Sequence, residues 1–325
     1  MSTMEKGTNM TTYRKLLNAL VLGAALAATG PLAGANAQTA GEGSVLERFV
    51  GDEPTAFATP DEAVAAFKTA IAADDVAALA TLLGLDAEAL AKADGLKERI
   101  GEIRDDAAEL LTVKGEGDVR IVSVGNEVWP FPFPVTKLDD GTWAFATYAG
   151  LEEIVNRRVG ENELQAIATA RAFVEAQRDY AALDHDGDGV LEYAQLLVSS
   201  PGLADGLYWP ADEVNGESPA GASINEAALD KANAGGGYFG YRFKILPGQG
   251  ENIAGGKYDY VINGNMIGGF ALVAWPVTYA ETGVNTFVVN QAGIVYEKDF
   301  AADTEKTASE MTVFNPDDSW TVVED

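Results

Sequence analysis

The spacing of apolar residues changes along this chain, and the change limits the folds open to it. In segments 59–111 and 151–183 apolar residues recur every three to four positions, which is the spacing of one helix face. In segments 119–145 and 238–298 they alternate with polar residues, as in strands with one buried face. Short turns such as Asp139-Asp140-Gly141 join these strands, so they should pair antiparallel. The order of helices, strands, long helix and strands predicts an α+β protein.

The N-terminal helices carry clear start signals. Thr59 is a good N-cap, Pro60 suits the first helical position, and Glu62 completes a capping box. A second short helix should follow Asp74-Asp75, and a third helical stretch should cover about 86–111. The alternating segments after it should form a small antiparallel sheet.

The C-terminal half should pack one long helix on an antiparallel meander of about five strands. The expected strands are 238–245, 258–262, 266–278, 286–290 and 294–298. The expected domains are a signal peptide at 1–37, a flexible leader at 38–54, an N-terminal α+β domain at 55–150 and a C-terminal domain at 151–325.

The first 37 residues have the pattern of an export signal. Arg14 and Lys15 precede an apolar run at 16–30, and Ala35-Asn36-Ala37 is a small-x-small cleavage site. The run is short for a stable membrane span. We therefore expect cleavage before Gln38 and a periplasmic or secreted protein without a stable span. The alternative is an uncleaved N-terminal anchor.

The composition excludes several classes of function. The chain has 325 residues, no Cys and one His, so disulfides, thiolate metal sites and multi-His centres are excluded. Its formal net charge is −28, which opposes binding to nucleic acid because phosphates require Lys and Arg. The same charge favours cations. The expected partner is an envelope protein or a small ligand.

An acidic loop at 184–192 is the sharpest chemical signal. Asp184, Asp186 and Asp188 occupy loop positions 1, 3 and 5, with a glycine at position 6. Calcium prefers six to eight oxygen ligands, and alternating carboxylates on such a loop can point inward together. Glu192 and the carbonyl of Val190 would add further oxygens. The candidate cofactor is therefore Ca²⁺.

The loop departs from an EF-hand at its last ligand position. Gln195 stands where a bidentate glutamate is required, which should weaken the site. The alternative is an aspartate-rich turn that caps a following helix beginning near Tyr193. His185 lies between two aspartates and is expected to point to solvent.

Paired acids raise the alternative of an enzyme. Glu152-Glu153 and the pair Glu161 and Glu163 are carboxylates of the kind that a glycosidase uses. They lie on expected helices of a very acidic chain, where chance pairs are common.

Several motifs resemble a known family. The motifs are WPFP at 129–132, DHDGDGVLEYAQ at 184–195, GYRFKIL at 240–246 and YDYVINGNMIGGFALVAWP at 258–276. They resemble the bacterial domain-of-unknown-function family 2950 over nearly all of the mature chain. The resemblance implies an exported protein and supplies no substrate or catalytic residue.

A second similarity concerns residues 161–298. This region is similar to the globular domain of type IV pilins and pseudopilins, which implies a helix packed on a small antiparallel sheet. Together these patterns favour an exported cell-envelope protein that is a calcium-assisted binding or structural module. The alternative is a hydrolase that uses carboxylates at the domain junction.

Overall fold

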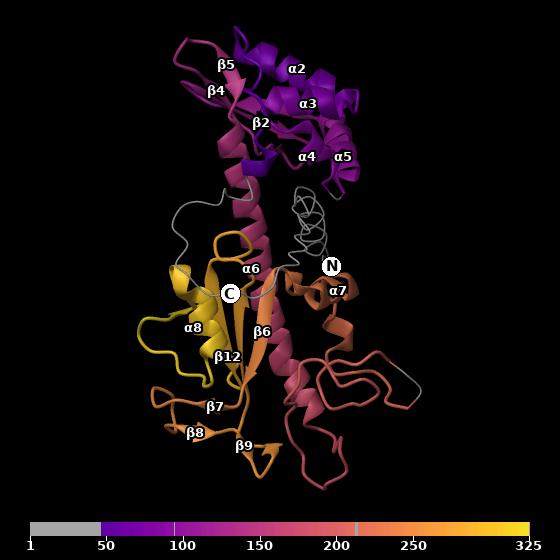
Figure 1. Ribbon diagram of the computed structural model, residues 1–325, viewed down its shortest axis with the longest axis vertical. Helices are drawn as coiled ribbons and strands as arrows, with labels where there is room; N and C mark the ends of the chain where they lie inside the picture. Colours follow the sequence, from indigo (N-terminus) through magenta and orange to yellow (C-terminus); the bar gives the residue numbers. More distant parts are fainter. Residues whose placement is uncertain (1–46, 94, 212–213, 325) are drawn as a thin grey trace, which may run out of the picture. The chain divides into compact units, whose positions relative to one another are not determined.

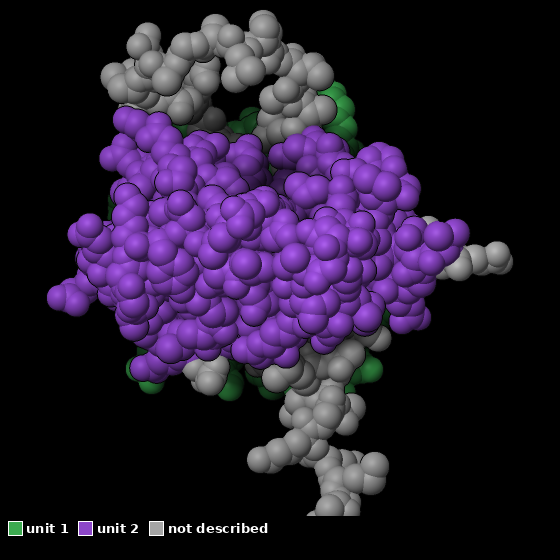
Figure 2. Space-filling view, turned by 90° about the horizontal axis from the view of Figure 1, so that it is seen from below, with its two compact units in different colours: residues 1–157 green, residues 158–325 purple. Residues whose placement is uncertain are grey.

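The structure is a computed structural model that describes residues 47–93, 95–211 and 214–324. The predicted signal peptide at 1–37, its cleavage site and most of the leader lie outside these residues. The chain divides into two compact units, residues 1–157 and 158–325 (Figure 2). The division falls inside one continuous helix, α6 (Thr147–Tyr180), seven residues after the boundary expected at 150/151.

The first unit combines helices with a small antiparallel sheet. Its helices are η2 (Glu47–Phe49), α2 (Pro60–Ala72), α3 (Val76–Leu83), α4 (Ala87–Ala91) and α5 (Leu96–Glu109). Its strands are β1 (Leu111–Lys114), β2 (Val119–Val124), β3 (Trp129–Pro130), β4 (Val135–Lys137) and β5 (Trp143–Phe145). They follow the order β1-β2-β4-β5, and β3 also pairs with β2.

Local capping places these helices where their sequence predicts. The Thr59 hydroxyl accepts a hydrogen bond from the Glu62 backbone N–H, and the Glu62 carboxylate accepts one from the Ala58 N–H. These bonds satisfy donors that a helix start leaves unpaired. Phe67, on the same helix, is fully buried between Phe131 and Phe145.

The expected helical stretch over 86–111 consists of two helices and ends two residues early. Helices α4 and α5 are separate, and Gly95 caps α5 with a left-handed φ of 70°. The chain then becomes strand β1, in which Leu111 lies opposite Val124 of β2. Pairing with β2 satisfies the backbone of this segment, so the helix ends at Glu109.

The second unit packs the rest of α6 against a five-stranded sheet. Its further helices are η3 (Gly221–Ser223), α7 (Glu226–Lys231), η4 (Ala232–Gly236), η5 (Ala301–Asp303) and α8 (Thr304–Glu310). The sheet contains β6 (Tyr241–Leu246), β11 (Ala271–Pro276), β12 (Asn285–Asn290), β13 (Tyr296–Asp299) and β14 (Thr321–Val322). All neighbours pair antiparallel in the order β14-β13-β12-β11-β6.

The central strand of this sheet is covered on both faces. Every residue of β11 is buried, and Figure 1 shows α6 and α8 on opposite sides of the sheet. On the α6 side the ring of Phe173 lies 5.5 Å from that of Phe270. On the α8 side the Trp275 indole donates to Glu305. The predicted α+β class, with a long helix and a C-terminal antiparallel sheet, is confirmed.

One expected strand does not join the sheet. Residues 258–262 were expected in the meander, but they form β8 (Tyr258–Asp259) and β9 (Val261–Ile262) in two small hairpins. Their partners are β7 (Gly248–Gln249) and β10 (Asn265–Met266). The tight turn at Asn263 and Gly264, both with positive φ, closes the second hairpin before the chain can reach the sheet.

None of the helices in the described part of the chain is both long enough and apolar enough to cross a membrane.

Candidate metal centre in the 184–188 loop

The acidic loop follows directly on the buried end of α6. The helix ends at Tyr180, whose side chain is buried in the core of the second unit. His185 was expected to point to solvent, but that prediction is wrong. Its ring is half-buried and stacks on Tyr180 at 3.9 Å, with Trp209 at 5.9 Å on an edge. Its Nε2 atom lies 3.1 Å from the Tyr180 carbonyl oxygen. Stacking between two aromatic rings therefore anchors the loop at its second position.

Backbone donors inside the loop shape its carboxylates. The two oxygens of Asp184 accept hydrogen bonds from Gly187 N–H at 2.8 Å and Gly189 N–H at 2.9 Å. Both glycines have positive φ, 78° and 86°, which a residue with a Cβ rarely adopts. These two bonds are the main reason that the pKa of Asp184 is lowered. Asp184 is therefore ionised at neutral pH.

Three of the predicted ligands gather at one place. Asp184, Asp186 and Asp188 are all exposed, and each offers one carboxylate oxygen within 4.8 Å of the others. No salt bridge found among the described residues involves any of the three. Like charges at this spacing repel one another, and a divalent cation would relieve that repulsion.

The other predicted ligands serve a neighbouring hairpin. The Glu192 carboxylate accepts a hydrogen bond from Met266 N–H at 3.0 Å, and the Gln195 amide donates to the Gly264 carbonyl at 2.7 Å. Glu192 is not a member of the aspartate cluster. The ligand role expected for the Val190 carbonyl stays a prediction. Its N–H donates to Asp188 at 2.7 Å.

The predicted helix from Tyr193 does not form, and that prediction is wrong. Tyr193 instead makes an antiparallel bridge with Met266, donating its N–H to the Met266 carbonyl at 2.8 Å. At the next residue, the amide of Gln177 bonds to both the N–H and the C=O of Ala194, each at 2.8 Å. Because these groups have partners in an extended segment, a helix would break bonds without replacing them.

Two residues that hold this site were missing from the sequence prediction. Gln177 is fully buried on α6 and lies in the apolar stripe with Phe173 and Tyr180. The signal in the sequence was a polar residue on an otherwise apolar helix face, because a buried polar side chain needs a hydrogen-bond partner. Asn265 donates to the second carboxylate oxygen of Asp188 at 2.7 Å, and its link to a loop 77 positions away carried no sequence signal.

Three of the four paired acids of α6 have partners that explain them, and the fourth, Glu152, is exposed. Glu153 forms a salt bridge with Arg157 at 2.7 Å, and Glu161 accepts from Gln165. Glu163 accepts hydrogen bonds from the N–H groups of Val284 and Asn285 at 2.8 and 2.9 Å. These contacts tie the helix to itself and to the β11–β12 loop.

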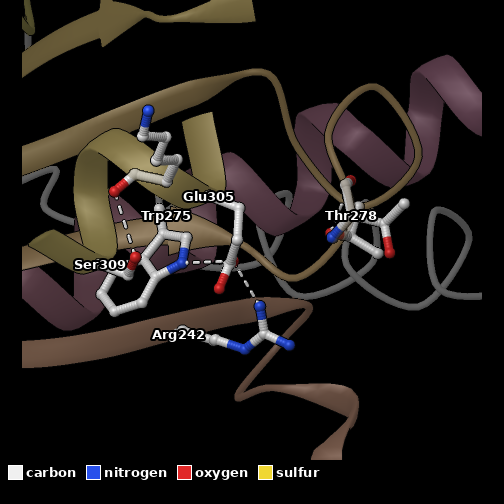
Figure 3. Close-up of polar contacts among 7 residues, drawn as sticks. Arg242, Trp275, Thr278, Glu305 and Ser309 are labelled. Carbon is white, nitrogen blue, oxygen red and sulfur yellow. Dashed lines mark hydrogen bonds and ion pairs between the residues drawn. The ribbon is translucent and has the colours of Figure 1, made fainter. Parts of the chain in front are cut away.

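A second polar cluster lies on the other face of the sheet. Figure 3 shows the Glu305 carboxylate between Arg242 and Trp275, at 2.5 Å from the guanidinium and 2.8 Å from the indole nitrogen. All three have a partner within the cluster, which fastens α8 to strands β6 and β11. An open depression of about 510 Å³ lies at α8 and the segment after it, and its lining includes Asp303, Lys306 and Glu310.

The comparisons with known proteins give one family. The family model described as "Protein of unknown function (DUF2950)" matches residues 54–323. No curated protein and no solved structure gives a significant match. The similarity to pilins therefore stays a prediction.

Proposed function

This chain belongs to the DUF2950 family, and we propose that it is an exported, calcium-assisted binding or structural module. One observation carries the proposal, namely the three carboxylates of Asp184, Asp186 and Asp188 that gather within 4.8 Å. Hard oxygen donors on a glycine-containing loop suit Ca²⁺, which accepts irregular geometry and completes its shell with water.

The site would be weak because its later ligand positions are engaged elsewhere. Glu192 and Gln195 bind the β9–β10 hairpin, so three carboxylates and solvent would supply most of the oxygens. Sites of low ligand count have dissociation constants of about 10⁻⁴–10⁻³ M, the range of extracellular calcium modules. That range agrees with the export expected from residues 1–37.

Calcium would act on the loop and, through it, on the hairpin. Asp188 is both a cluster member and the acceptor for Asn265. A cation that holds Asp188 would therefore also hold the hairpin against the loop. Binding to the folded state alone stabilises it by about 1.4 kcal/mol when free calcium is tenfold above the dissociation constant.

The test is a thermal melt of the full mature chain in chelator, in millimolar Ca²⁺ and in millimolar Mg²⁺. We expect Ca²⁺ to raise the melting temperature more than Mg²⁺ does, and Asp186→Asn to abolish the difference. Asp140→Asn is the matched control, because Asp140 is also exposed and accepts from the N–H two residues later. Equal melting temperatures in chelator and in calcium would contradict calcium binding and leave the loop as an aspartate-rich turn.

A further inference from the structure

Several exposed apolar side chains lie on the segments beside the acidic loop. Leu191, Leu203 and Val198 are 57%, 55% and 49% exposed, although each is large enough to favour burial. Three more lie in the following segment and in the β9–β10 hairpin. The six residues form what we call the apolar patch: Leu191, Leu196, Val198, Leu203, Ile262 and Ile267.

Hydrogen bonds hold the parts of this patch together. The bridge between Tyr193 and Met266 sets segment 191–196 beside the hairpin. On its other side, the Leu207 N–H donates to the Leu196 carbonyl at 3.0 Å, and Val198 forms a parallel bridge with Tyr208. Figure 1 shows these loops and the hairpin at the end of unit 2 where α6 ends, and that end faces the viewer in Figure 2. The patch is therefore carried by connected backbone.

The charges on the segments that carry the patch all have one sign. The sequence has no Lys or Arg between Arg178 and Lys231, and none between Lys257 and Lys298. All six residues of the patch, and the whole β9–β10 hairpin, lie within these two stretches. The charged side chains on the same loops are acidic, among them the three aspartates of the cluster and Glu192. A partner at this surface must bring positive charge.

We propose that the apolar patch docks a cationic amphipathic segment of a partner polypeptide. Its apolar side chains would cover the patch, and its Lys or Arg side chains would lie against the surrounding carboxylates. An anionic lipid surface or a second copy of this chain would bring negative charge against negative charge, so neither fits. The proposal does not depend on calcium binding.

The probe is a short synthetic amphipathic peptide of Lys and Leu, labelled for fluorescence anisotropy and titrated with the full mature chain in chelator. We expect the double substitution Leu191→Gln with Ile267→Gln to weaken binding about tenfold, because two apolar contacts are lost. Leu164→Gln is the matched control, since Leu164 is 62% exposed on α6 and lies outside the patch. It should change binding by less than about twofold.

Two further peptides separate apolar docking from general attraction to an acidic protein. A Glu–Leu peptide should not bind, and a Lys–Gln peptide should bind weakly and alike to the parent and the double variant. Equal loss in the Leu164→Gln control, or equal binding of Lys–Leu peptide to parent and double variant, would overturn the proposal. Binding of the Glu–Leu peptide would point to another occupant and overturn it too.

The calcium and peptide experiments can fail separately. If calcium binds the aspartate cluster, adding it should weaken the Lys–Leu peptide by removing negative charge beside the patch. If calcium does not change the melting temperature, the peptide titration still tests the apolar patch, because it is done in chelator. Full thermal stability of the double variant, measured in parallel, shows that lost binding is not lost folding.

Discussion

Gln177 gives the strongest test of how the loop is positioned. Its side chain is fully buried, and its amide bonds both backbone groups of Ala194, which is itself 1% exposed. The change Gln177→Leu keeps the volume similar but leaves a buried N–H and a buried C=O without partners. Each unpaired group costs about 1–3 kcal/mol. After roughly 1 kcal/mol of added apolar burial is subtracted from the cost of two unpaired groups, we expect the free energy of unfolding to fall by about 1–5 kcal/mol.

Gln177→Glu turns the same contact into a pH-dependent one. A protonated carboxyl can donate to the Ala194 C=O and accept from its N–H, as the amide does. An ionised carboxylate can only accept, and its burial is unfavourable, so the pKa of the introduced group should be raised in the folded state. Between the unfolded pKa of about 4.3 and that raised value, the stability of the variant should fall by about 1.4 kcal/mol per pH unit.

The assay is urea denaturation between pH 4 and pH 7.5, together with hydrogen exchange of residues 190–198. Near pH 4 the Gln177→Glu variant should match the parent, and at neutral pH its segment 190–198 should exchange faster. Gln195→Glu, measured in chelator, is the control, because Gln195 is exposed and makes one hydrogen bond to the hairpin. A Gln177→Leu variant within about 0.5 kcal/mol of the parent would refute the reasoning, since surface changes alone reach that size. So would a flat pH profile for Gln177→Glu.

Three further outcomes are expected elsewhere in the chain. Burial, and then the nearby carboxylate of Glu163, raise the pKa of Glu297. The stability that the neutral Glu297 carboxyl contributes is therefore lost as pH rises from 4.5, its ordinary pKa, through its raised folded pKa. The Glu297→Gln variant should therefore have a higher melting temperature than the parent at pH 7 and the same melting temperature at pH 4. Gly283→Ala would place a Cβ 2.1 Å from the buried Tyr241 hydroxyl and should lower the free energy of unfolding by about 1–3 kcal/mol. In a Tyr241→Phe background the added loss should be smaller, as a double-mutant cycle would measure. Sequencing of exported material should begin at Gln38, and a start at Met1 would contradict the predicted cleavage.

Much of the site's composition was predictable because its chemistry is local. Asp184, Asp186 and Asp188 lie two residues apart, and the glycines between and after them allow the positive φ values that fold the loop. Sequence spacing alone therefore brings these three carboxylates together. Glu192 and Gln195 are only a few residues further along, yet they bind a hairpin about 70 positions away. The hydrogen-bond partners of Glu192 and Gln195 could not be predicted, because they depend on which distant segment lies beside the loop.

The sequence by itself determined the elements whose stabilising contacts are short-range. The Thr59 cap, the Asp-Gly turn before β5 and the apolar stripe of α6 each depend on neighbours within one or two turns of chain. Only the tertiary structure decided which strands share a sheet, why residues after Glu192 are extended, and what Gln177 binds. Those outcomes depend on buried backbone groups finding partners across long separations, and a local pattern does not specify which partner is near.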